Sequence, residues 1–315
     1  METLPLELLG AIALELPIPE LRRFRLLGRR YAAAGFPALV RELSFLNTLD
    51  TADALRTLSQ SPYGSLGAVR HLAIYDGAWP VAASQEEWAR HSLFLRSRKR
   101  SNSIATRLAY NRYEQFIRQE ASRTCSRLQR LNVDGLLDTR DLEPGRYRYK
   151  TIRHLYVNAV LAGEGLEDSI ANFLGAFPRL TTLTIKTFPR GSINHQRLPL
   201  QQMRWSDLQF CDIVGTWAPE NELFDFMERH PLKRLTLKQV TLTSGSWKSY
   251  FSRARDLKPR PNIVCEGILP NRDSEGYFIE DFKSQRLLDW FLTHAEFPWP
   301  FSDPNDDIPT LSLSS

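Results

Sequence analysis

The chain has 315 residues, of which 42% are hydrophobic and 24% charged, a composition typical of folded globular proteins that excludes global disorder. It contains no run of about 18 uncharged apolar residues, which is the length that a membrane-spanning helix needs. The N-terminus carries Glu2, Glu7 and Glu15 instead of the basic segment that opens a secretory signal. We therefore expect an intracellular protein, cytoplasmic or nuclear, with no membrane span.

The net charge of +5 is concentrated in one segment. Residues 90–130 contain eleven Lys or Arg and two Glu, a local charge of +9, so the rest of the chain sums to −4. Within this segment the cluster from Arg96 to Arg100 predicts an insertion over about residues 90–110. It is either a solvated loop or a nuclear-targeting or polyanion-binding segment.

No residue pattern indicates catalysis. The cysteines Cys125, Cys211 and Cys265 are isolated, which favours buried free thiols over a disulfide or zinc site. The six histidines lack the spacing of metal ligands, and the chain has no glycine-rich phosphate loop and no nucleophile motif. We expect no catalytic residue, no metal and no cofactor.

The first 45 residues predict three short helices. The first carries an apolar side chain every fourth residue, at Leu4, Leu8, Ile12 and Leu16. Pro17 ends it, a second helix ends at Gly28, and a third begins near Arg29. Because about 45 residues cannot bury such apolar faces alone, these helices need a partner surface.

The segment from Leu4 to Phe36, LPLELLGAIALELPIPELRRFRLLGRRYAAAGF, resembles an F-box. The likeness rests on the Leu-Pro-x-Glu-Leu opening and on the apolar-apolar-x-Arg-Arg-aromatic run at 26–31, and the following FPALVRELSF is similar to the end of F-boxes of filamentous fungi. Gly28 departs from the family, which often has Cys there. The resemblance implies docking on the Skp adaptor of a cullin–RING ubiquitin ligase through Leu4, Pro5, Leu8, Ile12, Leu16 and Leu21. A helical cap on the following domain is the alternative.

Residues 46–270 repeat the pattern apolar-x-x-apolar-x-apolar. Aligned on the second apolar position, the copies fall at Leu72, Leu131, Leu155, Leu183, Met203 and Leu235. Three of the five intervals lie in the 20–29 residues of leucine-rich repeats, and helical stripes over 166–177 and 223–227 alternate with the predicted strands. We expect an α/β fold, an irregular leucine-rich-repeat-like solenoid with a parallel inner sheet; a closed α/β domain is the alternative.

Residues 271–315 predict a C-terminal cap with a polar tail. Its aromatic side chains, Trp290, Phe291, Phe297 and Trp299, are expected to cover the last repeat rather than form a ligand pocket.

Residues between the apolar positions of each strand should point away from the core. The exposed face is then predicted to bind a protein target through Arg130, Tyr156, Lys186, Arg204, Arg234 and Lys238. This face carries five basic side chains and one acidic, so we expect an acidic or phosphorylated target, although a merely solvated face would look the same. The confined basic charge argues against nucleic acid as a partner.

Together these features predict a non-catalytic substrate receptor of an SCF-type ubiquitin ligase. The F-box at 1–45 would recruit the Skp adaptor and, through it, a cullin, while the repeats hold a target. The alternative is a repeat-type interaction scaffold without a ligase link, which the basic cluster could direct to the nucleus.

Overall fold

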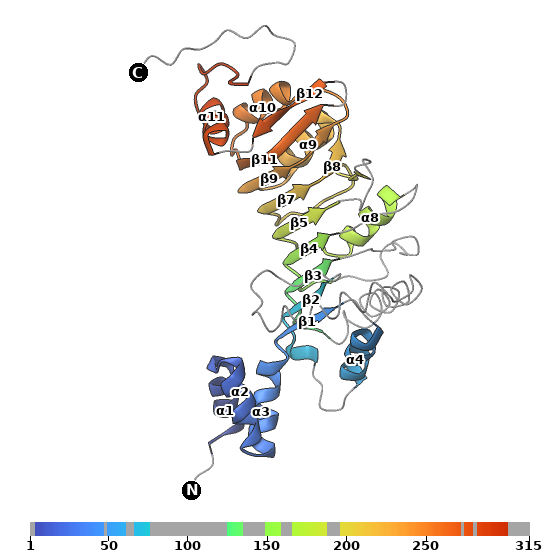
Figure 1. Ribbon diagram of the computed structural model, residues 1–315, viewed down its shortest axis with the longest axis vertical. Coiled ribbons are helices and arrows are strands. Elements are labelled where there is room, and N and C mark those ends of the chain that lie inside the picture. Colours follow the sequence, from blue (N-terminus) through green and yellow to red (C-terminus); the bar gives the residue numbers. More distant parts are fainter. Residues whose placement is uncertain are drawn as a thin grey trace, which may run out of the picture. The chain divides into compact units, whose positions relative to one another are not determined.

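The computed structural model describes residues 4–46, 49–60, 66–75, 125–134, 149–158, 166–187, 196–271, 274–279 and 282–301 (Figure 1). Within these ranges the chain is an α/β protein with eight α-helices and eight parallel main strands, which confirms the predicted class and the parallel sheet. It divides into two compact units, residues 1–138 with 143–157 and residues 139–142 with 158–315. The predicted insertion at about 90–110, with the cluster from Arg96 to Arg100, lies outside the described residues, as does the tail beyond residue 301.

The first unit opens with the three predicted helices, α1 (Leu6–Glu15), α2 (Ile18–Leu26) and α3 (Arg29–Leu39). Both α1 and α2 pack on α3. Close packing of α2 and α3 depends on Gly35, because a Cβ there would lie 2.8 Å from the Cγ of Arg25. The guanidinium of Arg30 donates to the carbonyl of Leu4 at 2.6 Å and ties the start of the segment to α3. The Pro17 and Gly28 boundaries are therefore confirmed.

The strands of the first unit follow directly. They are β1 (Glu42–Leu46), β2 (His71–Tyr75), β3 (Arg130–Asp134) and β4 (His154–Asn158), with α4 (Leu49–Gln60) and a 3₁₀ helix at Leu66–Ala68 between β1 and β2. Leu43, Leu72 and Leu131 pair across β1, β2 and β3. The sheet therefore begins within the segment predicted as the F-box, because residues 42–45 already belong to β1.

The second unit repeats this arrangement. Its helix α8 (Leu166–Gly175) precedes the parallel strands β5 (Thr182–Lys186), β7 (Phe210–Val214), β9 (Arg234–Lys238) and β11 (Asn262–Asn271). Leu183, Cys211, Leu235 and Ile263 pair in register, so equivalent residues recur after 28, 24 and 28 positions. Each of these four side chains is at most 1% exposed and forms part of the core.

Short strands and helices complete the second unit. The short strands are β6 (Gln196–Arg197), β8 (Thr216–Ala218) and β10 (Thr241–Leu242), with β12 (Ser274–Ile279) antiparallel to β11; the helices are α9 (Glu220–Arg229), α10 (Trp247–Asp256) and α11 (Phe282–Thr293). Helices α9 and α10 lie side by side (Figure 1). The backbone φ is positive at Gly215 (72°) directly after β7, at Gln239 (51°) directly after β9 and at Gly267 (81°) within β11.

The predicted repeat at Leu200–Phe210 is wrong in register. Residues 200–209 form turns and loop, the strand begins at Phe210, and Cys211 rather than Met203 pairs with Leu183 and Leu235. The loop matched the pattern because its apolar side chains are buried as well: Leu200, Met203, Trp205 and Leu208 are at most 4% exposed. Burial of a loop and burial of a strand leave the same apolar spacing in a sequence.

Of the four C-terminal aromatic residues expected to cover the last repeat, Phe291 and Trp299 contact side chains of α10, whereas the ring of Phe297 lies against that of Trp290. Phe291 is 3% exposed, and the Trp299 ring lies 5.9 Å from that of Phe251 in a stacked arrangement. Trp290 is instead 51% exposed and stacks on His294. The cysteines Cys125, Cys211 and Cys265 are buried free thiols, as predicted.

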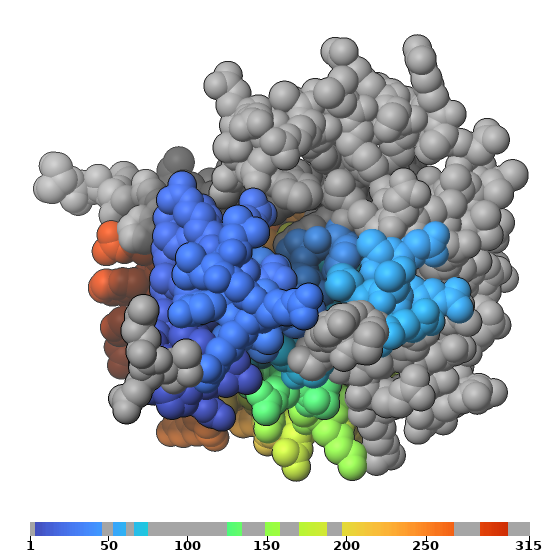
Figure 2. All heavy atoms as spheres, turned by 90° about the horizontal axis from the view of Figure 1, so that it is seen from below, coloured from blue at the N-terminus to red at the C-terminus, as the bar shows by residue number. Residues whose placement is uncertain are grey.

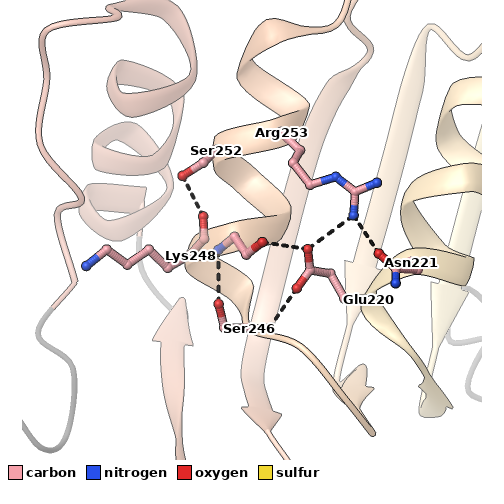
Figure 3. A network of polar contacts seen from close by, with 7 residues as sticks. Glu220, Asn221, Ser246, Lys248, Ser252 and Arg253 are labelled. Carbon is pink, nitrogen blue, oxygen red and sulfur yellow. Dashed lines mark hydrogen bonds and ion pairs between the residues drawn. The ribbon is translucent and has the colours of Figure 1, made fainter.

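A polar network joins the N-terminal ends of α9 and α10 (Figure 3). Glu220, which is 6% exposed, accepts hydrogen bonds from the Ser246 amide (2.8 Å), the Ser249 hydroxyl (2.7 Å) and the Arg253 guanidinium (3.3 Å). Arg253 also donates to the Asn221 side chain at 2.8 Å. The carboxylate therefore neutralises the positive end of α10 and fixes one helix against the next.

Candidate interaction surfaces

The described residues contain no group of three or more His, Cys, Asp or Glu side chains that could hold a metal ion. Burial, with the charge of Asp212, raises the pKa of the Cys211 thiol, and burial also raises that of Cys265. Both thiols are thus held in the protonated form, which is a poor nucleophile and a poor metal ligand. The features of the described residues that suit binding are surfaces rather than catalytic groups.

The helices α1–α3 expose an apolar surface. Of the eleven exposed large apolar side chains in the described ranges, eight lie between Leu4 and Leu27. Leu4, Leu8 and Ile12, all named from the sequence, are 49%, 51% and 43% exposed. Figure 2 shows the helices as one continuous surface in dark blue. Exposed apolar side chains concentrated in one segment make α1–α3 a candidate interaction surface.

The composition of α1 explains why this surface stays exposed. The helix LELLGAIALE is apolar on nearly every side, and it buries Leu9 and Ala13 while the stripe with Leu8 and Ile12 faces away. One apolar face is used within the unit, and a second remains available to a partner.

The other named contacts divide between surface and interior. Pro5 is exposed and Leu16 is half-buried, but Leu21 is 1% exposed and lies in the interior of the helical group. The predicted adaptor contacts did not include Leu6, Leu14, Ile18, Leu26 and Leu27, which are 46–86% exposed. The signal for these residues was the scarcity of polar residues in α1 and the apolar pair beside Gly28.

Five of the six predicted target-binding residues lie on main strands. Arg130, Tyr156, Lys186, Arg234 and Lys238 stand on β3, β4, β5 and β9 at positions that alternate with the core residues. Arg204 lies in the loop before β7 and is a correction, since the register error moved it onto a strand that does not exist there.

Asp212 takes the strand position that Arg204 was expected to have. Its Oδ2 accepts from the Thr184 hydroxyl at 3.2 Å, and its Oδ1 lies 3.8 Å from the Arg234 guanidinium. Lys238 forms an ion pair with Glu266. The basic charge of this face is therefore partly neutralised within the protein, and the second unit is less basic than the sequence suggested.

Phe210 is another exposed residue of this face. It is the first residue of β7 and is 37% exposed. The guanidinium of Arg234 lies 6.0 Å from the centre of its ring.

The sheet edge of the first unit is more basic. Arg130, at the start of β3, was named from the sequence, whereas Arg70, Arg127 and Lys150 were not. All four are exposed. The sequence signal that could have identified these residues is the Lys or Arg that stands shortly before, or at the start of, successive strands.

None of the helices among the described residues combines the length and the apolar composition needed to cross a bilayer. Comparison of the chain with protein-family models and with curated proteins finds no match.

Proposed function

We propose that this protein is a substrate receptor of an SCF-type cullin–RING ubiquitin ligase. In this proposal α1–α3 form an F-box that binds the Skp adaptor, and the strands β1–β11 form a leucine-rich-repeat-like region that binds a protein target. The main supporting observation is that Leu4, Leu8 and Ile12 are exposed, although the helices α1–α3 already bury other apolar side chains against one another. A helix that buries one apolar face within the protein and exposes another is suited to docking.

Recurring backbone contacts support the repeat-like part of the proposal. Where successive strands begin, one carbonyl accepts from two N–H groups of the next strand: Arg41 from Arg70 and His71, Arg70 from Gln129 and Arg130, Gln129 from Arg153 and His154, Thr181 from Gln209 and Phe210, and Gln209 from Lys233 and Arg234. The same bonds at equivalent positions in both units are typical of stacked repeats, in which each unit contacts its neighbours.

The proposed role is positional. The receptor holds a target beside the conjugating enzyme that the rest of the ligase recruits, which raises the local concentration of target lysines. No residue of this chain takes part in ubiquitin transfer in this scheme, and no cofactor is required.

The proposal is tested by binding of the purified chain to the Skp adaptor. The double variant Leu8→Asp/Ile12→Asp is expected to weaken adaptor binding by at least about 100-fold, because burying two carboxylates in an apolar interface costs several kcal/mol. Since both side chains are exposed, the variant should remain folded, which circular dichroism checks. The matched control is Leu287→Asp, an exposed leucine on α11, which should bind as the wild type does.

Two results would contradict the proposal. Unchanged adaptor binding by the folded double variant would exclude the F-box assignment of this surface. Failure of the wild-type chain to bind the adaptor would instead favour the interaction scaffold without a ligase link.

A further inference from the structure

Three arginines stand at one edge of the first unit's sheet. Arg70 directly precedes β2, Arg130 begins β3, and Arg153 directly precedes β4. The N–H groups of Arg130 and Arg153 donate to the carbonyls of Arg70 and Gln129, and Arg130 pairs in register with His71, so Arg130 stands one position further along its strand than Arg70 does. Neighbouring strands are about 4.8 Å apart, so β2, β3 and β4 together span about 10 Å.

Among the residues that the structure describes, four basic side chains at this edge have no ion-pair partner. Arg70, Arg127, Arg130 and Lys150 are exposed, and none forms an ion pair with another residue of the described ranges. Glu42 pairs in register with His71, and His71 pairs with Arg130. Glu42 is the one carboxylate among these three aligned residues. The second unit differs, since carboxylates lie beside Arg234 and Lys238 on its sheet.

The charge of Arg130 affects the pKa of two neighbouring histidines. Burial and then the charge of Arg130 lower the pKa of His71, opposed by Glu42, and the same two causes lower that of His154. The charge of Arg130 therefore reaches imidazoles on both flanking strands.

The backbone at this edge limits the anions that fit. The N–H groups of Arg70, Arg130 and Arg153 are all occupied by the carbonyls of the preceding strands. No nest of free amides therefore surrounds an anion here, as phosphate sites of the backbone type require. The groups available to an anion are therefore the side chains. Their planar guanidinium groups match the two oxygens of a carboxylate, and they stand at the starts of different strands instead of converging on one point.

We propose that this edge, formed by the exposed side chains of Arg70, Arg127, Arg130 and Lys150, binds an extended segment of the target that is rich in Asp and Glu. The inference rests on the proposed receptor function and names the class of target segment. The carboxylates of such a segment lie beside these four exposed cations. A nucleic-acid duplex would require a broader basic surface than four side chains.

The test uses the purified full-length chain and a fluorescein-labelled ten-residue peptide that carries four Glu residues separated by Gly or Ser. Three comparison probes have the same length: a peptide with Gln for Glu, a peptide with phosphoserine for Glu, and a single-stranded RNA. Fluorescence anisotropy at 50 mM and 300 mM NaCl measures binding. We expect the Glu peptide to bind, the Gln peptide to bind at least tenfold more weakly, and the difference to shrink at the higher salt.

The variants locate the site. Arg70→Glu/Arg130→Glu is expected to weaken Glu-peptide binding at least tenfold, and the milder Arg70→Gln/Arg130→Gln severalfold. The matched control Lys248→Glu/Lys258→Glu reverses two exposed lysines of the second unit, carries the same charge change and should alter binding less than twofold. Thermal melting confirms that each variant is folded.

Equal losses in the two Glu variants would overturn the inference, since they would show non-specific attraction. Tighter binding of the phosphoserine peptide by tenfold or more, or of the RNA, would overturn it in favour of those ligands. This assay does not contain the Skp adaptor. A negative result here would contradict only the acidic-segment site, whereas the ligase proposal is tested by the adaptor-binding experiment.

Discussion

Glu220 illustrates how single residues hold successive helices together. Its carboxylate is buried, yet three donors from the first turns of α10 surround it. The turn before α10 is shaped to fit, because Gly245 has a φ of 83° and a Cβ there would lie 2.3 Å from Glu220 Oε2. Such a buried acid is stable only while its donors are in place.

Replacing this acid tests its structural role. Glu220→Ala is expected to lower the free energy of unfolding by about 2–3 kcal/mol, because it leaves the Ser246 amide and the Ser249 hydroxyl without their acceptor. Glu228→Ala, an exposed acid on the same helix, should change it by less than about 0.5 kcal/mol. Urea denaturation measures both, and equal effects would contradict the assigned role.

At the scale of elements, the main strands of the second unit share one local device. Gly215, Gln239 and Gly267 each follow the register residues Cys211, Leu235 and Ile263 by four positions, and each has a positive φ. The N–H of Thr187 donates to Val214, that of Gly215 to Lys238 and that of Gln239 to Glu266, which repeats the same bond along the sheet. The chain therefore changes direction at equivalent points in successive units.

Glycine substitution tests this device. Gly267→Ala is expected to destabilise the protein by about 1–2 kcal/mol, since an L-residue is strained at a φ of 81° although the space for a Cβ is ordinary. Gly175→Ala at the end of α8 is the control, because a Cβ there meets nothing within 4 Å, and it should stabilise by about 0.5–1 kcal/mol. Melting temperatures that fall equally for both would show that the positive φ does not matter.

At the scale of the whole molecule, three histidines link stability to pH. His230 is 6% exposed; its Nδ1 donates to the Phe226 carbonyl at 2.6 Å and its Nε2 accepts from the Trp205 amide at 3.2 Å. Burial is the main cause that lowers the pKa of His230, His71 and His154. Protonation of His230 would also break the bond that holds the loop before β7.

The sign of the pH dependence follows from linkage. Above the ordinary histidine pKa of about 6.5, both folded and unfolded chains carry neutral imidazoles and nothing is lost. As the pH falls below that value, the unfolded chain takes up protons first, so the free energy of unfolding decreases until the folded-state pKa is reached.

Denaturant unfolding between pH 7.5 and 5.5 is the measurement. The wild type should lose stability across this range. His230→Gln should be less stable at pH 7.5 and should show a smaller loss, because one of the histidines whose pKa burial lowers is gone. An identical pH slope in the variant and the wild type would contradict the assignment.

Local interactions explain which sequence predictions succeeded. Pro17 and Gly28 set the helix boundaries near the N-terminus, and the stripes over 166–177 and 223–227 correspond to α8 and α9. Proline, glycine and apolar periodicity act within a few residues, so they can be interpreted without knowing the partners of a segment.

The failures depended on contacts between distant residues. Leu21 has the same apolar character as Leu8, but α3 covers the first and not the second. The loop at 200–209 and strand β7 are both buried, and only pairing with β5 and β9 distinguishes them. Whether Arg234 or Arg70 keeps its charge available depends on carboxylates that neighbouring strands bring close.

The sequence by itself determined the α/β class, the three N-terminal helices and the parallel strand pattern, because these arise from local propensity and from apolar spacing. The register of the strands, the side chains left exposed on α1 and the location of unpaired charge were decided only by the tertiary structure. The physical reason is that burial and charge neutralisation depend on which two surfaces come into contact. The sequence of one segment does not say which distant segment will pack against it.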